Sequence, residues 1–317
     1  MLEWLMVGLG LVILLLSGDL LVRGAVNLSL RLGIPPLIVS LTIVAFGTSA
    51  PELLITIEAV RDNLSGMALG NVIGSNTANV LLVLGIPALI TTMHTAECNT
   101  RKNYIFMMGA SLLFAALCFM GPLRWPHGLV LLGALAYILI DAGREAVRHR
   151  ADACDAPIDL EEVEGADPKI SGWSIAFFLV IGLIGLPLGA DILVNNSVII
   201  AGRFGLSDTV IGLTLVAIGT SLPELATTVM AALRRQADVA LGNVIGSNMF
   251  NLLAIMGIGS LIGPIQISEQ VLQFDLWVMM AASLFLLPFV YLGWNLTRIW
   301  GIVLTGAYAA YLAVVLM

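Results

Sequence analysis

Charged residues are scarce in this chain. Only 11% of its 317 residues are Asp, Glu, Lys or Arg, whereas soluble domains carry about 25%. The hydrophobic share is 59%, and the mean hydropathy is +1.01. Because so few charges cannot cover the surface of a folded protein in water, we expect the lipid bilayer to be its solvent and main partner.

Cysteines and basic clusters are also sparse, which excludes several classes of function. The cysteines Cys98, Cys118 and Cys154 form no CxxC and no Cys/His cluster, so neither a zinc site nor a disulfide framework is indicated. No basic patch with interleaved aromatic residues points to nucleic acid. We expect free thiols, no cofactor, no nucleic acid and no obligatory protein partner. Residues 4–22 lack a positive n-region and a cleavage site, which favours a retained helix over a signal peptide.

The acidic residues gather in one segment. Seven carboxylates lie between Asp152 and Asp167, inside a predicted loop over residues 144–172. Their spacing does not match the DxDxDG pattern of a calcium-binding EF-hand loop. We therefore interpret this run as a solvated linker rather than a regulatory calcium site.

Ten apolar runs are long enough to cross a bilayer, which takes about 20 residues. They predict an all-α membrane protein with ten transmembrane helices. The helices are expected near 4–23, 36–60, 67–92, 104–121, 127–143, 173–202, 208–233, 239–264, 272–293 and 298–316. Cytoplasmic loops carry an excess of Lys and Arg. With the N-terminus outside, eleven basic residues fall on the cytoplasmic side and three outside. We therefore expect both termini outside and the 144–172 loop in the cytoplasm.

Two motifs occur twice in the chain. GTSAPEL at 47–53 returns as GTSLPEL at 219–225, and GNVIGSN at 70–76 returns unchanged at 242–248. A single ungapped alignment places 19–85 on 191–257, with 30 identities in 67 pairs. Residues 1–143 and 173–317 would each form a repeat of five helices. Since five is odd, the second repeat enters the membrane inverted, which is typical of secondary transporters that work by alternating access.

Each GTSxPEL motif places polar groups on one helix face. Ala45, Thr48, Ser49 and Glu52 are spaced i, i+3, i+4, i+7, as are Ala217, Thr220, Ser221 and Glu224. Pro51 removes a backbone donor and should kink the helix. We expect the kink to free carbonyl oxygens near Ala45 and Phe46. Carbonyls, hydroxyls and one carboxylate form an all-oxygen ligand set of the kind that hard cations prefer.

The GNVIGSN motifs supply the neighbouring helices. Their glycine pairs allow close helix approach, and Asn71 and Asn243 are expected to join helices by hydrogen bonds. The side chains of Ser75 and Asn79 share one helix face, as do those of Ser247 and Asn251. Related by pseudo-symmetry, the two copies should form one site with two carboxylates among neutral oxygens.

Two ionised glutamates in a low dielectric are costly unless they are compensated. One calcium ion, two protons or two sodium ions would neutralise the two negative charges. Three sodium ions would leave one net positive charge. A site that must be filled by one group or the other favours an exchanger. The many neutral oxygens favour sodium over protons as the counter-ion.

Proton/calcium exchange and a passive cation channel remain alternatives. An intramembrane enzyme is disfavoured, because neither of the aligned segments 19–85 and 191–257 holds a histidine, and GSN is not a GxSxG elbow.

The doubled GTSxPEL and GNxxGSNxxN motifs resemble those of the cation/calcium antiporter superfamily, and most closely the short prokaryotic members of its sodium/calcium exchanger branch. The resemblance implies a prokaryotic inner-membrane protein that binds calcium and sodium ions near the midplane. It implies a core of helices two, three, seven and eight, across which helices one and six slide. Many relatives carry Asp at the position of Asn251, whereas both copies here have Asn. This difference bears on the sodium count and the pH dependence rather than on the calcium site.

The resemblance also assigns ligands by motif. The implied calcium ligands are Glu52, Glu224, Thr48 and Thr220. The implied shared sodium and calcium ligands are Ala45, Ser49, Ser75, Asn79, Ala217, Ser221, Ser247 and Asn251.

Overall fold

The structure, a computed structural model, is helical throughout the part of the chain that it describes, apart from two isolated β-bridges. It describes residues 2–95, 98, 100–153, 170–204 and 217–315. Eight helices there are long and apolar enough to cross a membrane. The pair Pro36–Thr48 and Ala50–Arg61, bent by 44°, adds a ninth span if it is counted as one. The predicted all-helical membrane fold is therefore confirmed. The predicted helix over 208–233 lies partly outside the described residues.

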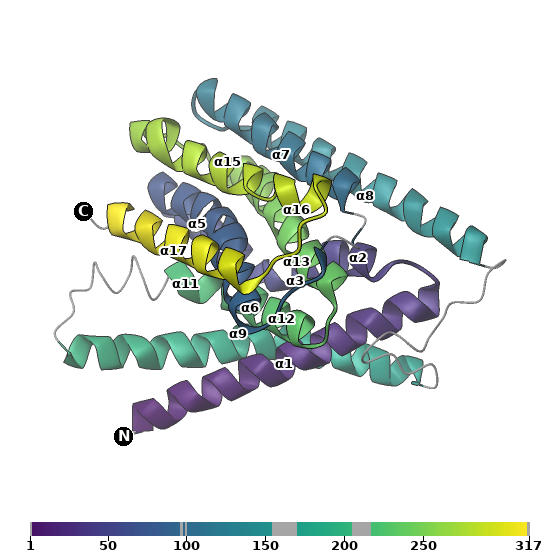
Figure 1. Cartoon of the computed structure of the whole chain (residues 1–317). Coiled ribbons are helices and arrows are strands. Elements are labelled where there is room, and N and C mark those ends of the chain that lie inside the picture. The colour runs from purple at the N-terminus through teal and green to yellow at the C-terminus, as the bar shows by residue number, and fades with distance from the viewer. Residues whose placement is uncertain (1, 96–97, 99, 154–169, 205–216, 316–317) are drawn as a thin grey trace.

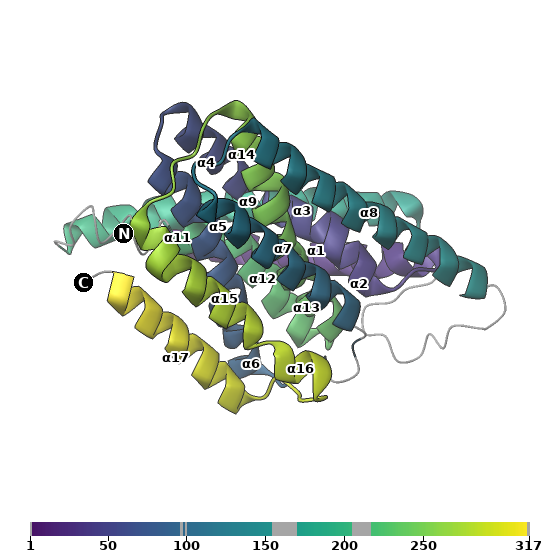
Figure 2. The same cartoon turned by 90° about the horizontal axis from the view of Figure 1, so that it is seen from above.

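Two long helices pack against each other along one side of the molecule. These are α1 (Leu2–Leu32) and α9 (Gly172–Arg203), which lie side by side in Figures 1 and 2. Glycines allow their backbones to touch, because a Cβ on Gly10 would lie 2.8 Å from the Gly189 carbonyl oxygen. An ion pair of 2.7 Å joins Glu3 to Arg203 at one end. We call these two helices the long pair.

The duplicated motifs form the interior of the bundle beside the long pair. In the first copy the elements are α2 (Pro36–Val39), η1 (Ser40–Val44), α3 (Ala45–Thr48), α4 (Ala50–Arg61), α5 (Ser65–Ala78), η2 (Asn79–Val83) and α6 (Gly85–Ile90). In the second copy they are α11 (Ala217–Thr220), α12 (Leu222–Leu233), α13 (Ala237–Met249), η6 (Phe250–Ile255) and α14 (Met256–Ile262). The η elements are π-helices. A close approach binds the copies together, since a Cβ on Gly246 would lie 2.5 Å from the Leu41 carbonyl oxygen.

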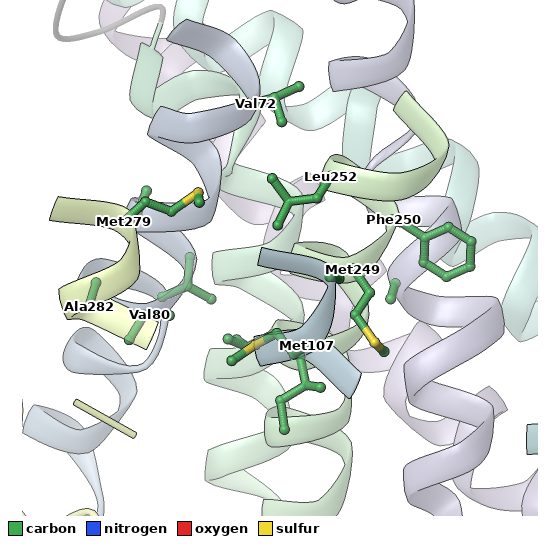
Figure 3. Close-up of a cluster of buried hydrophobic side chains, with 14 of the residues drawn as sticks. Val72, Val80, Met107, Met249, Phe250, Leu252, Met279 and Ala282 are labelled. Atoms are coloured by element: carbon green, nitrogen blue, oxygen red, sulfur yellow. The ribbon is translucent and has the colours of Figure 1, made fainter. Parts of the chain in front are cut away.

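Peripheral helices cover the opposite side of this interior. They are α7 (Arg101–Phe119), α8 (Trp125–Ala153), η7 (Val271–Asp275), α15 (Leu276–Leu284), α16 (Leu287–Tyr291) and α17 (Arg298–Val315). Figure 3 shows Val72, Met107, Met249 and Met279 from four different helices in one buried cluster. Apolar packing of this kind fixes the position of the motif helices from the side away from the long pair.

Two predicted helix ends are wrong. Helix α1 continues to Leu32 rather than ending near residue 23, and α8 continues to Ala153 rather than ending near residue 143. The prediction ended each apolar run near a charged residue, but these charged residues have partners in the same helix or in a neighbouring one. Arg23 pairs with Asp19 at 3.0 Å, and Lys102 of α7 bonds Glu145 of α8 at 2.8 Å. The predicted loop over 144–172 therefore begins as helix, and most of its acidic run lies outside the described residues.

Helix α1 begins and α17 ends at the same end of the bundle (Figures 1 and 2). This placement agrees with the predicted topology, in which both termini lie on one side of the membrane. The identity of that side stays a prediction.

Candidate functional site

Both GTSxPEL motifs interrupt their helices at the serine. Ser49 separates α3 from α4 with φ −83° and ψ 7°, and Ser221 separates α11 from α12 with φ −88° and ψ 4°. These values lie near the sparsely populated bridge region. A proline follows in the first turn of the next helix in each copy, where its missing N–H costs least. The kink predicted at the first motif is confirmed.

The expectation that this kink frees the Ala45 carbonyl is wrong for this conformation. The Ala45 oxygen accepts the Ser49 amide at 3.1 Å and the Thr48 hydroxyl at 3.3 Å. Pro51 lacks the N–H that an α-helix would direct to Gly47, four residues earlier. The missing donor therefore affects Gly47 rather than Ala45.

Two glutamates are buried at the helix breaks. Glu52 and Glu224 each lie in the first turn of the helix after the break, and both are 0% exposed. A helix N-terminus favours a nearby negative charge, but the charges of these two carboxylates repel each other. Both oxygens of Glu52 and the Oε2 of Glu224 have no hydrogen-bond partner in the described structure. Since buried carboxylates need compensation, this pair requires cations or protons.

Hydroxyls from both copies surround Glu224. Its Oε1 accepts the Ser49 hydroxyl at 3.1 Å and approaches the Ser247 hydroxyl at 3.5 Å. The Thr48 hydroxyl lies 3.3 Å from Asn243 Oδ1 and 3.5 Å from Ser247 Oγ. Residues predicted from the first GTSxPEL motif and the second GNVIGSN motif thus meet at one carboxylate, although they are far apart in the sequence.

An asparagine holds each glutamate helix in place. Asn71 Nδ2 donates to the Glu52 carbonyl oxygen and to Thr56 Oγ1, both at 3.0 Å. Asn243 Nδ2 donates to the Glu224 carbonyl oxygen at 3.4 Å and to Thr228 Oγ1 at 3.2 Å. The predicted role of these asparagines in joining helices is confirmed. The two threonines were missed, although they occupy equivalent positions in the two aligned copies.

A second polar group lies where the two GNVIGSN helices meet. Asn76 Nδ2 donates to the Asn248 carbonyl oxygen at 3.2 Å, and Asn79 Nδ2 donates to Asn248 Oδ1 at 3.1 Å. Both side-chain atoms of Asn251 are buried without a partner in the described structure. Asn79 begins η2 and Asn251 lies within η6, and π-helices occur frequently at functional sites. Sequence reasoning missed Asn76 and Asn248, which are identical in the two motif copies.

The other predicted ligands are positioned less completely. Ser75 is buried in α5, and Thr220 is half-buried at the end of α11, which begins at Ala217. The buried Ser221 hydroxyl has no hydrogen-bond partner among the described residues. The Ser49–Glu224 bond is therefore not repeated by Ser221 on Glu52 in this conformation.

The chemistry of the site is that of oxygen ligands. The described residues contain no group of three or more His, Cys, Asp or Glu that could hold a metal ion. Two carboxylates among hydroxyls and amides instead match the preference of hard cations such as calcium and sodium.

Comparison with known proteins gives a consistent result over nearly the whole chain. A family model described as sodium/calcium exchanger protein matches residues 2–140 and 174–317. The sodium/calcium exchanger MaX1 of Methanosarcina acetivorans is 35% identical over 98% of this chain and 98% of its own length. The inner membrane protein YrbG of Escherichia coli is 34% identical over 96% of this chain and 94% of its own.

Solved structures of the sodium-calcium exchanger NCX_Mj have the same fold. One of them, soaked with sodium and calcium, superposes with a TM-score of 0.81 at 31% identity, covering 99% of this chain and 98% of that one. Another, soaked without either ion, gives a TM-score of 0.82 at 30% identity, covering 98% of each chain. The repeated motifs, the buried carboxylate pair and these matches together show that the chain belongs to the sodium/calcium exchanger family.

Proposed function

We propose that this protein is a secondary active antiporter that exchanges sodium for calcium across the membrane by alternating access. The observation that carries the proposal is the position of Glu224, where hydroxyls from both motif copies converge on a fully buried carboxylate. Membership of an exchanger family supports cation/calcium exchange. A catalytic role is not part of the proposal, since the relatives compared are exchangers and membrane proteins.

Calcium and sodium would occupy the same carboxylate pair in turn. In this proposal Glu52 and Glu224, with Thr48 and Thr220, bind calcium. The shared ligands would be Ala45, Ser49, Ser75, Asn79, Ala217, Ser221, Ser247 and Asn251. Since one calcium ion balances both carboxylates, its departure leaves two buried negative charges that must be met by other cations. That requirement couples the two ion movements and makes the protein an exchanger.

Sodium is the proposed counter-ion because the site is rich in neutral oxygens. Hydroxyls and amides such as Ser49, Ser247 and Asn79 are ligands that a monovalent hard cation can use. A proton needs none of them, because it binds a carboxylate directly. Proton/calcium exchange by the same two glutamates is the second candidate, and a passive cation channel is a weaker third.

Alternating access would follow from the duplication. We infer ten transmembrane helices in two inverted repeats, 1–143 and 173–317, joined by the acidic segment. Both termini would lie on the outer, non-cytoplasmic face of the inner membrane, in keeping with the excess of basic residues in the predicted cytoplasmic segments. The matching breaks at Ser49 and Ser221, which are equivalent positions of the two copies, support related roles for those copies. The same local structure could then open to either side of the membrane.

The test is calcium uptake into proteoliposomes under separate gradients. An outward sodium gradient should drive uptake, whereas an outward proton gradient, or no gradient, should not. Uptake driven only by protons would favour the second candidate. Calcium entry without any counter-ion would indicate a channel and contradict the exchanger proposal.

A further inference from the structure

Helix α1 of the long pair packs closely on α12, one of the motif helices. A Cβ on Gly18 would lie 3.0 Å from the Ala226 carbonyl oxygen. Ala226 is 6% exposed as a result. The contact lies between one long helix and the helix that carries Glu224, so it must open if the long pair slides.

An ion pair lies beside this contact. Both Nε and Nη2 of Arg234, just after α12, contact Asp19 Oδ1 of α1. Arg23 holds the other Asp19 oxygen at 3.0 Å. The side chains of Asp19 and Arg234 are only 16% and 19% exposed. This ion pair links the long pair to the helix that carries Glu224.

Each partner in this contact has an equivalent in the other copy, at the position given by the ungapped alignment of the repeats. The equivalents are Ala190 for Gly18, Leu54 for Ala226, Asp191 for Asp19, Asp62 for Arg234 and Asn195 for Arg23. Leu54, which would make the equivalent contact of α9 on α4, is 63% exposed in this conformation. Asp191 instead accepts a hydrogen bond of 2.8 Å from Asn195 within its own helix.

The mirror-image closure would be weaker for two physical reasons. Ala190 and Leu54 carry more side-chain volume than Gly18 and Ala226, so the backbones could not approach to the same distance. Asp191 and Asp62 would then occupy the places of an ion pair, and two like charges repel. Alternating access between symmetric halves would therefore have an asymmetric energy.

We propose that Asp19 and Arg234 form a one-sided latch. The latch favours the conformation closed at α1–α12 over the mirror conformation closed at α9–α4, and so sets the preference of the exchanger between the two faces of the membrane. Both are positioning residues, since neither contacts the carboxylate pair. The inference rests on the proposed alternating-access function.

Installing the latch on the other side tests it most sharply. Asp62→Arg would give Asp191 a cationic partner in the mirror conformation, and Asp19→Asn removes the existing latch. Each variant should raise the ratio of mirror to observed conformation about two- to fivefold. Electron paramagnetic resonance between spin labels at Phe204, just after α9, and Leu261, in α14, would report that ratio. Both sites are exposed, and the native cysteines would be replaced first.

Two further variants separate the latch from a general effect of mutation. Asp62→Asn removes one like charge without adding a partner, so it should shift the ratio less than Asp62→Arg does. Adding Asp191→Asn to Asp62→Arg should return the ratio toward wild type, because it removes the new partner. A change that only damaged packing would not be reversed in this way.

The outcomes distinguish the latch from the proposed function. Closing α9 onto α4 should bring Phe204 nearer to Leu261, because α14 contacts α4. A shorter Phe204–Leu261 distance in Asp62→Arg, reversed by Asp191→Asn, therefore supports the latch. Unchanged distances in Asp62→Arg and Asp19→Asn variants that still exchange calcium overturn the latch and leave the function standing. A wild-type protein that exchanges no cation overturns the proposed function, and the distances then decide the latch alone.

Discussion

Replacing Gly246 by alanine should weaken cation binding through packing alone. An added Cβ would lie 2.5 Å from the Leu41 carbonyl oxygen and 2.6 Å from the Ala45 Cβ. Favourable non-bonded contacts between carbon atoms lie at about 3.5–4.0 Å, so α13 must move away by roughly 1 Å. The next residue, Ser247, is 3.5 Å from both Glu224 Oε1 and Thr48 Oγ1. Both distances are already at the upper limit for a hydrogen bond, so both contacts would be lost.

The size of the effect follows from the role of Ser247 as a proposed ligand. A polar contact to a charged group contributes about 1.5–3 kcal/mol, so displacing the Ser247 oxygen should weaken calcium binding by about 2 kcal/mol, or roughly thirtyfold. Overpacking should also lower the free energy of unfolding by about 1–3 kcal/mol. Calcium-dependent thermal shifts of the purified protein, measured over a range of calcium concentrations, would report both quantities.

Gly109→Ala is the matched control for this substitution. Gly109 is exposed in α7, and an added Cβ meets nothing within 4 Å. This change should leave calcium affinity unaltered and raise helix stability by up to about 1 kcal/mol. Wild-type affinity and melting temperature in Gly246→Ala would refute the claim that close packing of α13 positions the site.

Two further predictions concern charge. Asn251→Asp adds a third acid one helical turn beyond Ser247, where both amide atoms now lack partners, so the sodium or proton dependence of transport should change more than the half-saturating calcium concentration. Identical sodium and pH profiles for variant and wild type would show that the position is silent. Partial deletion of the acidic segment within 154–169 should leave calcium transport in proteoliposomes intact, because a solvated linker contributes no ligand. Loss of transport in a well-folded deletion variant would contradict the linker interpretation.

Local chemistry made part of the site predictable from sequence. Pro51 and the i, i+3, i+4, i+7 spacing predicted a kinked helix with Thr48, Ser49 and Glu52 on one face, and the ungapped repeat predicted that two copies would meet. The hydrogen bonds from Ser49 and Ser247 to Glu224 are the structural form of that meeting.

Other features depended on tertiary contacts that no local pattern carries. The Ala45 carbonyl is satisfied because the Ser49 amide and the Thr48 hydroxyl both turn back to it. Helix α8 extends beyond its apolar segment because Lys102 of α7 forms ion pairs with Asp141 and Glu145 of α8. The Asn76–Asn248 contact depends on how the GNVIGSN helices of the two copies cross, and identity between the copies does not by itself predict that crossing.

The central claim is that Glu52 and Glu224, from different copies, form one cation site. Equilibrium binding of radioactive calcium to the purified protein tests it most directly, with Glu52→Gln and Glu224→Gln as the variants. We predict one high-affinity calcium ion per wild-type chain, displaced by sodium, and loss of that ion in either variant while the fold is retained. Retention of wild-type binding in either variant would mean that the carboxylates act separately and would contradict the account.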